Sequence, residues 1–463
     1  FLVFHDAKTG RTYTLDGREK APASAGPDRF LKPDGTPMGF ANAVPGGYSV
    51  GVPGTVALLA EAHKRWGKLP WATLFAPAIR LADEGIVVSE RLNRFSGSFQ
   101  SMLVASPAAA RIFLDANGKP WPIGHVLKQP ELAATLRMLA ADGPDAFYKG
   151  PIGAEISKAV ANAFRNPTAL TAQDLAAYRV GDRPPLCRPY RQWKICAMGP
   201  PSSGGIAVLQ IMMQLERFDL AKLGPKSLTA QHLFAESQRL AYADREAFGA
   251  DADFVQVPVE GLLEPAYIRA RSALIRPDAA MAEARAGTPR GMKTANRAPL
   301  IDIPSTSHIV SADAAGNVAT YTSTIEGPFG SGLVAAGFLL NNELTDFDMA
   351  PVRDGNPAPN RVQPGKRPRS SMSPVIVYDA KGKPVAAFGA AGGATIIAQV
   401  AKALIARLDW GLPVEEAVAL PQVIADRSGL RYEAGTFLAE MAPGFTALGH
   451  QNVRGGTLPL KGG

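Results

Sequence analysis

The hydrophobic positions along the chain follow two periods, and the period changes near residue 305. Over the first 250 residues, apolar side chains recur at three- and four-residue steps, which is typical of amphipathic helices. We predict helices over residues 55–66, 74–84, 131–141, 153–164, 207–217 and 230–247. Ser227 is predicted to cap the last of these, because serine favours the first position of a helix.

After residue 306 the pattern becomes the alternation of strands. Strands are predicted within residues 309–324 and over 337–340, 374–378 and 385–388, and a helix follows over 394–408. Residues 277–304, rich in Ala, Arg, Pro and Gly, are predicted to form an exposed connector. Strands enclosed between long helices predict a layered α/β architecture.

The first predicted hairpin places two threonines opposite each other. If its turn centres on Ala315, paired residue numbers sum to 630, and Thr306 faces Thr324. A threonine hydroxyl becomes a useful nucleophile when a base lies beside it, and a free α-amine on the same residue is one such base. That amine requires cleavage of the bond between Ser305 and Thr306. Paired threonines also stabilise hairpins without chemistry, so these residues alone leave both interpretations open.

The composition is that of an ordinary globular protein, with 46% hydrophobic and 19% charged residues in 463. No apolar run reaches the length of about 20 residues that a membrane helix needs, so no membrane span is expected. The net charge of +8 lies entirely before Thr306, where it is scattered, since the rest of the chain has 13 basic and 13 acidic residues. Without a basic tract interleaved with aromatic residues, we expect no nucleic-acid partner.

The densest basic cluster contains Arg361, Lys366, Arg367 and Arg369. Charge runs usually face solvent, so the favoured interpretation is a solvated loop. The alternative is an electrostatic collar for a carboxylate substrate.

The two cysteines, Cys187 and Cys196, flank a predicted turn over residues 190–193, which makes them cross-strand neighbours. A hairpin disulfide and two buried thiols both remain open. The six histidines lack metal-ligand spacing, and His308 is interpreted as a strand residue that shapes the site. Residues 330–335 resemble a dinucleotide fingerprint but lack its βαβ context, so we expect no metal and no cofactor.

Several motifs occur together in an order that carries more information than any one of them. They are Thr306-Ser307-His308 with Thr324 eighteen residues later, Leu340-Asn341-Asn342-Glu343 with Asp346, the run 366–374, Gly392-Gly393 and, upstream, the segments 18–22, 52–56, 71–82 and 200–205. With these motifs the chain resembles the γ-glutamyltranspeptidases over nearly its whole length.

This resemblance implies a fold, a processing step and a compartment. The implied fold is the four-layer αββα sandwich of N-terminal-nucleophile hydrolases. Residues 1–305 would form the large-subunit portion and 306–463 the small-subunit portion, produced by self-cleavage between Ser305 and Thr306 and interwoven in one domain. Relatives are periplasmic or secreted. The chain carries no signal-peptide pattern, and both of its ends look clipped.

The resemblance also assigns roles to individual residues. Thr306 would be nucleophile and base, Thr324 its support, and the amides of Gly392 and Gly393, at the start of a helix near Ala394, the oxyanion hole. The carboxylate of the substrate would bind Arg18, Ser370 and Ser371, and its ammonium Glu343 and Asp346. The implied donor is glutathione-like, and the acceptor is water or an amino acid.

One position departs from the family pattern, because Glu326 stands where an asparagine is usual. A third carboxylate near Glu343 and Asp346 is expected to raise the pKa of at least one of them unless a cation lies between them. The pocket would then prefer a more cationic head group, and the alternative is that Glu326 points away. The departure leaves a cephalosporin or glutaryl acylase as the alternative activity, although three carboxylates would repel a glutaryl group and so favour a γ-glutamyl one. An unprocessed, inactive binding protein is the alternative from another class. Residues 347–369 contain no tyrosine, which predicts an open cleft without an aromatic lid.

Overall fold

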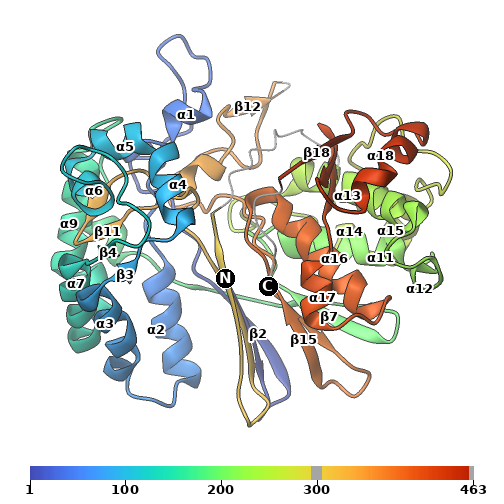
Figure 1. Ribbon diagram of the computed structural model, residues 1–463, viewed down its shortest axis with the longest axis horizontal. Helices are drawn as coiled ribbons and strands as arrows, with labels where there is room; N and C mark the ends of the chain where they lie inside the picture. Colours follow the sequence, from blue (N-terminus) through green and yellow to red (C-terminus); the bar gives the residue numbers. More distant parts are fainter. Residues whose placement is uncertain (293–304, 354, 458–463) are drawn as a thin grey trace.

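The computed structural model describes residues 1–292, 305–353 and 355–457. Two β-sheets pack face to face at its centre, and helices cover both outer faces (Figure 1). Phe1 and Val3 of the first sheet share one buried core with Val375 and Val377 of the second. The result is the αββα layering expected from the sequence.

The first sheet carries the predicted threonine hairpin. Its strand order is β5-β2-β1-β9-β8. The bounds are β1 (Leu2–Asp6), β2 (Arg11–Asp16), β5 (Gly181–Arg183), β8 (Ser307–Ala312) and β9 (Val318–Ser323). Strand β1 pairs with β2 on one side and β9 on the other, so residues more than 300 positions apart in sequence lie side by side.

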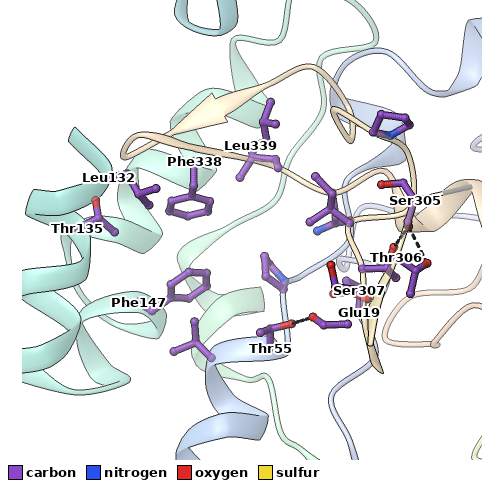
Figure 2. A pocket seen from close by; sticks show the side chains of 18 of the residues that line it. Glu19, Thr55, Leu132, Thr135, Phe147, Ser305, Thr306, Ser307, Phe338 and Leu339 are labelled. Carbon is purple, nitrogen blue, oxygen red and sulfur yellow. Dashed lines mark hydrogen bonds between the residues drawn. The ribbon is translucent and has the colours of Figure 1, made fainter. Parts of the chain in front are cut away.

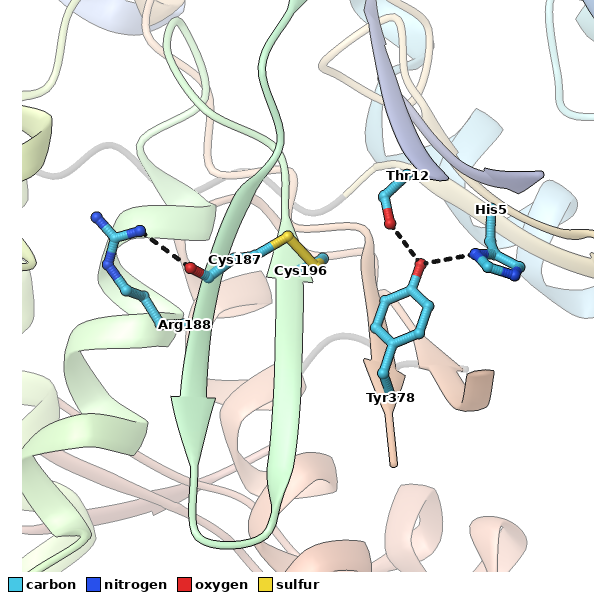
Figure 3. The surroundings of a disulfide bond; sticks show 6 residues. All are labelled: His5, Thr12, Cys187, Arg188, Cys196 and Tyr378. Carbon is cyan, nitrogen blue, oxygen red and sulfur yellow. Dashed lines mark hydrogen bonds between the residues drawn. A yellow bond between two sulfur atoms is a disulfide. The ribbon is translucent and has the colours of Figure 1, made fainter. Parts of the chain in front are cut away.

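The second sheet has the order β15-β14-β7-β6. Its strands are β6 (Leu186–Tyr190), β7 (Trp193–Ala197), β14 (Val375–Tyr378) and β15 (Pro384–Phe388). Cys187 and Cys196 face each other in the β6–β7 register and form a disulfide (Figure 3). The bonded alternative left open by the sequence is therefore the one observed.

The outer layer on the second sheet is built mainly from three long helices, α11 (Gly204–Leu215), α13 (Leu228–Phe248) and α16 (Ile396–Leu408), in which most residues are buried. It also contains the shorter helix α15 (Pro265–Ser272). Ser227 caps α13 as predicted, accepting a hydrogen bond from the amide of Ala230. Helix α11 begins three residues earlier than predicted. Its first two residues, Gly204 and Gly205, pack so closely that an added Cβ atom would lie 2.1 Å from Ser373 Oγ and 2.0 Å from the Met198 carbonyl oxygen, respectively.

The opposite outer layer covers the first sheet and belongs to the first half of the chain (Figure 1). Its main helices are α2 (Thr55–Trp66), α3 (Ala76–Glu84), α7 (Pro130–Asp142) and α9 (Pro151–Ala161), all close to their predicted bounds. Shorter helices that the periodicity did not indicate are α4 (Glu90–Ser98), α5 (Gln100–Ala105), α6 (Pro107–Phe113) and α8 (Asp145–Tyr148). Within the three described ranges, no helix is both long and apolar enough to cross a bilayer.

The interpretation of the basic cluster as a solvated loop is wrong for three of its four members. Lys366, Arg367 and Arg369 are 0%, 2% and 6% exposed. The Lys366 ammonium donates to the Pro359 carbonyl oxygen, and Arg367 forms an ion pair with Asp16 at 3.2 Å. The segment 366–369 packs between parts of the chain that are remote in sequence and that supply these acceptors. The order of residues along the sequence does not reveal such partners.

The predicted connector is described as far as residue 292, where its irregular backbone agrees with the prediction. Residues 293–304 lie outside the described part of the chain, so the prediction for them stays a prediction.

Candidate active site

The β8–β9 hairpin places Thr306 opposite Thr324, as the counting predicted. Ser307 pairs with Ser323 and His308 with Thr322, so the next pair outward is Thr306 and Thr324. Both threonines lie at the end of the hairpin that faces the interior of the molecule. The turn over residues 313–317 is stabilised by the Asp313 carboxylate, which accepts bonds from the amides of Ala315 and Asn317.

The carbonyl oxygen of Ser305 lies between the two threonine hydroxyls (Figure 2). Thr306 Oγ1 donates to it at 2.7 Å, and Thr324 Oγ1 donates at 2.5 Å. Thr324 Oγ1 in turn accepts a bond from the amide of Glu326 at 2.8 Å, which fixes its rotamer. Both hydroxyls polarise this carbonyl group, and one of them, that of Thr306, belongs to the adjacent residue.

A polar pocket opens on one side of Thr306 and gathers most of the predicted site residues. Its lining consists of Arg18, Arg245, Ser305, Thr306, Thr324, Glu326, Asp346, Ser370, Ser371, Met372, Gly393, Ala394 and Ile396. These residues lie in loops that adjoin the strands of both sheets and at the ends of helices. Arg18 and Ser371, which are far apart in the sequence, therefore lie in one pocket. Two predicted residues, Glu343 and Gly392, are not in this lining.

Arg18 is held by the two acids that the sequence assigned to the ammonium group. Its guanidinium forms ion pairs with Glu343 and Asp346 and donates to the carbonyl oxygens of Pro368 and Arg369. Arg18 is 2% exposed and Glu343 is fully buried. Most of the five N–H donors of Arg18 are therefore already used by protein groups.

Arg245 is a pocket residue that the sequence reasoning missed. It lies in the last turn of α13, where its Nε donates to Ser203 Oγ at 2.9 Å and its Nη2 to Ser371 Oγ at 2.6 Å. In the described residues it pairs with no carboxylate. Burial, with the nearby charge of Arg369, lowers the pKa of Arg245 to about 10, so it stays charged at neutral pH. Its partners Ser203 and Ser371 belong to the motifs 200–205 and 366–374, but Arg245 itself lies in a predicted helix outside any motif, so no signal in the sequence pointed to it.

Glu326 completes a group of carboxyl groups around the pocket. Its backbone has φ of +74°, in the left-handed region where asparagine is better tolerated than glutamate. Its carboxylate accepts a hydrogen bond from the Asn342 side chain. Burial, and then the charges of Glu19, Asp346 and Glu326, raise the pKa of Glu343 well above its ordinary value against the opposing effect of Arg18.

Gly392 and Gly393 lie next to a helix, but that helix starts later than predicted. A 3-10 turn over Gly393–Thr395 precedes α16, which begins at Ile396 rather than near Ala394. Gly392 has φ of +132° and Gly393 of +58°, both in the region that favours glycine. Thr395 Oγ1 donates to the Gly392 carbonyl oxygen at 2.7 Å, which orients this turn towards the pocket that Gly393 lines.

His308 lies on β8 behind the threonine pair. Its Nδ1 is 2.9 Å from Thr322 Oγ1 and its Nε2 is 3.3 Å from Thr320 Oγ1. Burial lowers the pKa of His308 to about 4, so the ring is neutral at physiological pH. Over residues 1–292, 305–353 and 355–457, no group of three or more His, Cys, Asp or Glu side chains has an arrangement that holds a metal ion.

The other side of Thr306 faces a different kind of space. A cavity of about 540 Å³ lies there, with serine and threonine side chains around Thr306 and leucine and phenylalanine side chains from α7, α8 and β11 (Phe338–Leu339) in the rest of its wall. Figure 2 shows Leu132, Thr135, Phe147 and Phe338 grouped across this cavity from Ser305 and Thr306. The nucleophile candidate thus lies between a charged pocket and an apolar one.

Comparison with known proteins shows which sequences this chain is similar to. The sequence model of the γ-glutamyltranspeptidase family matches residues 1–458. A glutathione hydrolase proenzyme of Bacillus subtilis (strain 168) is 38% identical over 445 residues, covering 94% of this chain and 74% of that protein. An acylase ACY 1 proenzyme of Pseudomonas sp. (strain SE83) is 35% identical over 413 residues, covering 89% of this chain and 70% of that protein.

A solved structure confirms the fold. The cephalosporin acylase from Bacillus halodurans superposes with a TM-score of 0.83 at 24% sequence identity, covering 98% of this chain and 80% of that one. At this identity the likeness establishes the αββα architecture alone.

Proposed function

The chain belongs to the γ-glutamyltranspeptidase family of hydrolases and acyl transferases, and from that premise we propose that Thr306 is the nucleophile it frees by cutting itself after Ser305. The observation that carries the proposal is the Ser305 carbonyl oxygen lying between the hydroxyls of Thr306 and Thr324. In this step Thr306 Oγ adds to the Ser305 carbonyl carbon and the peptide nitrogen leaves as the α-amine of Thr306. Water then hydrolyses the resulting ester and leaves a carboxylate on Ser305.

The freed α-amine then serves catalysis. It accepts the proton of Thr306 Oγ as this oxygen attacks the γ-carbonyl of a γ-glutamyl amide. Amides of Gly392 and Gly393, at the positive end of the 3-10 turn and α16, stabilise the oxyanion. The proton passes to the leaving amine, and water or an amino acid then takes the glutamyl group from the ester. Glutathione-like compounds are the proposed donors.

We assign the α-carboxylate of the substrate to Ser370, Ser371 and Arg245. Arg18 connects these residues to the carboxylates of Glu343 and Asp346, with which it forms ion pairs. Arg245 is the pocket cation without a carboxylate partner among the described residues, and it already orients the Ser371 hydroxyl. Arg18 is neutralised by Glu343 and Asp346. A carboxylate therefore gains more from Arg245 than from Arg18.

The ammonium of the substrate is assigned to Asp346 and Glu326, which line the pocket, with Glu343 as the buried carboxyl group behind them. Glu343 Oε1 is buried and has no hydrogen-bond donor within the described residues. An ammonium group in the pocket supplies donors and positive charge to this group of carboxyls, whereas a glutaryl chain supplies neither. This difference favours the γ-glutamyl group over the glutaryl group of the alternative acylase activity.

The relatives' names as proenzymes support a large and a small subunit from one precursor, with the proposed boundary between residues 305 and 306. A periplasmic or secreted location is proposed from the same relatives, and the disulfide between Cys187 and Cys196 supports an oxidising compartment.

The test of the proposed activity compares γ-glutamyl and glutaryl p-nitroanilides as substrates of the processed enzyme. We expect kcat/KM to be at least about tenfold higher for the γ-glutamyl compound, the factor that 1.4 kcal/mol of differential binding gives. Faster glutaryl turnover would establish the acylase alternative instead.

A further inference from the structure

The apolar cavity beside Thr306 shares little with the polar pocket. Ser305, Thr306 and Thr324 line both spaces, and the remaining wall residues differ. The cavity wall is supplied by α2, α7, α8 and β11 (Phe338–Leu339), elements that contribute nothing to the head-group pocket. The reacting oxygen of Thr306 thus lies at the junction of two chemically distinct spaces.

The far end of the cavity has no unpaired polar atom in its described lining. Leu132, Leu136, Leu139, Phe147 and Phe338 form most of it, and the rings of Phe147 and Phe338 stack with centroids 5.9 Å apart. Thr135, the hydroxyl residue among them, already donates to the Ala336 carbonyl oxygen at 2.6 Å. Such a surface gains from an apolar group and offers nothing to a charged one.

The charged members of the lining are Arg91 and Glu19. Arg91 is exposed on α4. Glu19 is buried next to Arg18, with its carboxylate 3.9 Å from the Arg18 guanidinium, and Figure 2 places it near Ser307 rather than beside Phe147 and Phe338. The leucine and phenylalanine side chains of the far end therefore determine which part of a bound substrate this end can accept.

We propose that this cavity binds the amine part of the amide and selects amines that carry an aromatic or branched aliphatic side chain. The inference rests on the proposed function, in which the acyl head group occupies the polar pocket. The two substituents of a scissile amide point to opposite sides of its carbonyl carbon, so an acyl chain in the polar pocket directs the amine towards the cavity. The same space then receives the acceptor amine when the acyl group is transferred.

The size of the cavity agrees with this occupant. Its volume of about 540 Å³ lies within the range of about 300–1,000 Å³ found for pockets that bury small ligands. A phenylalanine or leucine residue fits such a space, whereas ammonia or glycine leaves it unfilled. γ-Glutamyl conjugates of apolar amino acids are therefore the expected substrate class.

The test compares three amides that share the γ-glutamyl group and differ only in the amine, namely L-glutamine, γ-glutamylglycine and γ-glutamylphenylalanine. In the wild-type enzyme, kcat/KM for the phenylalanine conjugate should exceed that for the glycine conjugate by about tenfold or more, the scale of discrimination by apolar pockets. L-glutamine, whose amine part is ammonia, reports on the catalytic machinery alone.

Two variants change the cavity and one serves as their control. Leu136→Trp fills the apolar end, and Phe338→Ala removes one of its walls. Both should lower kcat/KM for γ-glutamylphenylalanine by about tenfold and leave L-glutamine hydrolysis within about twofold. Leu59→Trp adds the same indole at a position of the neighbouring helix α2 that is 43% exposed, and it should change neither rate. Self-cleavage into two fragments shows that each variant has folded.

The outcomes separate this inference from the function on which it rests. If no γ-glutamyl amide is hydrolysed, the proposed function fails, and the inference falls with it. Hydrolysis of all three amides without a preference, or an equal loss of L-glutamine hydrolysis in Leu136→Trp, contradicts the inference alone. It is also overturned if the wild type hydrolyses phenylacetylglycine and Leu136→Trp does not, because the cavity would then hold the acyl group.

Discussion

The Thr324 hydroxyl donates a hydrogen bond of 2.5 Å to the carbonyl oxygen of Ser305. This contact joins the second threonine of the hairpin to the bond that self-cleavage must break. In the proposed self-cleavage, negative charge develops on that oxygen as Thr306 attacks, and the Thr324 hydroxyl would stabilise this transition state. The Glu326 amide, which donates to Thr324 Oγ1, keeps the hydroxyl pointed at it.

Removal of this donor should slow processing. For Thr324→Ala we expect the rate of self-cleavage to fall about 10²-fold, the lower end of the cost of losing one oxyanion donor. Thr324→Ser retains the hydroxyl and should process within about tenfold of wild type. The rates are read from the disappearance of the intact chain on denaturing gels. Equal rates for the alanine and serine variants would remove Thr324 from the processing step.

Arg245 should control binding of the head group. Arg245→Met removes a charge-assisted contact, and we expect KM for γ-glutamyl p-nitroanilide to rise about 10- to 100-fold, as follows from 1.5–3 kcal/mol per bond. Arg245→Lys should recover part of this loss, since it restores the charge without the planar fork. Arg269→Met, an exposed arginine on α15, is the control and should leave KM unchanged. An unchanged KM in Arg245→Met would mean that Arg18, rather than Arg245, binds the carboxylate of the substrate.

Glu326 should favour an ammonium-bearing head group. Glu326→Gln keeps an acceptor for the Asn342 side chain and removes one negative charge from the group of carboxyls. The ratio of kcat/KM for γ-glutamyl over glutaryl anilide should fall by about tenfold, which corresponds to 1.4 kcal/mol of differential binding. Glu415→Gln, on the exposed side of α17 (Val414–Ala419), supplies the matched change of charge and should leave the ratio unaltered. A ratio that stays constant in Glu326→Gln would mean that this carboxylate does not reach the head group.

Stability should fall in acid because of His308. Burial lowers its pKa from 6.5 to about 4, so between these values the unfolded chain binds a proton that the folded chain does not. The free energy of unfolding therefore decreases as pH falls from 6.5 to 4, by at most about 3 kcal/mol from this group. His308→Gln should flatten that part of the curve. Urea unfolding of both proteins in the uncleaved Thr306→Ala background measures it, and parallel curves would contradict the assignment.

The features that could be predicted from the sequence are those set by neighbouring residues, such as hairpin register and helical periodicity. The turn residues 313–317 fix the hairpin register, and with it the meeting of Thr306 and Thr324. The same arithmetic brought Cys187 opposite Cys196. Long amphipathic helices such as α2 were found at their observed ends, because each has one periodic apolar face.

Features that depend on remote partners were not visible in the sequence. Arg245 reaches the pocket because the end of α13 packs against the segment that carries Ser371, 126 residues later. Lys366 and Arg367 are buried because Pro359, Asp16 and Asp251 meet them there. The short helices α4 to α6 follow one another across Phe99 and Ser106-Pro107, and such brief segments have too few turns for a periodic pattern to emerge.

The central claim, that the chain frees Thr306 as its nucleophile, is tested most directly by intact mass and N-terminal sequencing of the purified protein. We expect two fragments, the second beginning Thr-Ser-His with a free α-amine, and hydrolysis of γ-glutamyl amides only after they appear. Thr306→Ala should remain one inactive chain. An uncleaved wild-type chain that hydrolyses these amides, or a fragment that begins elsewhere than Thr306, would contradict the account.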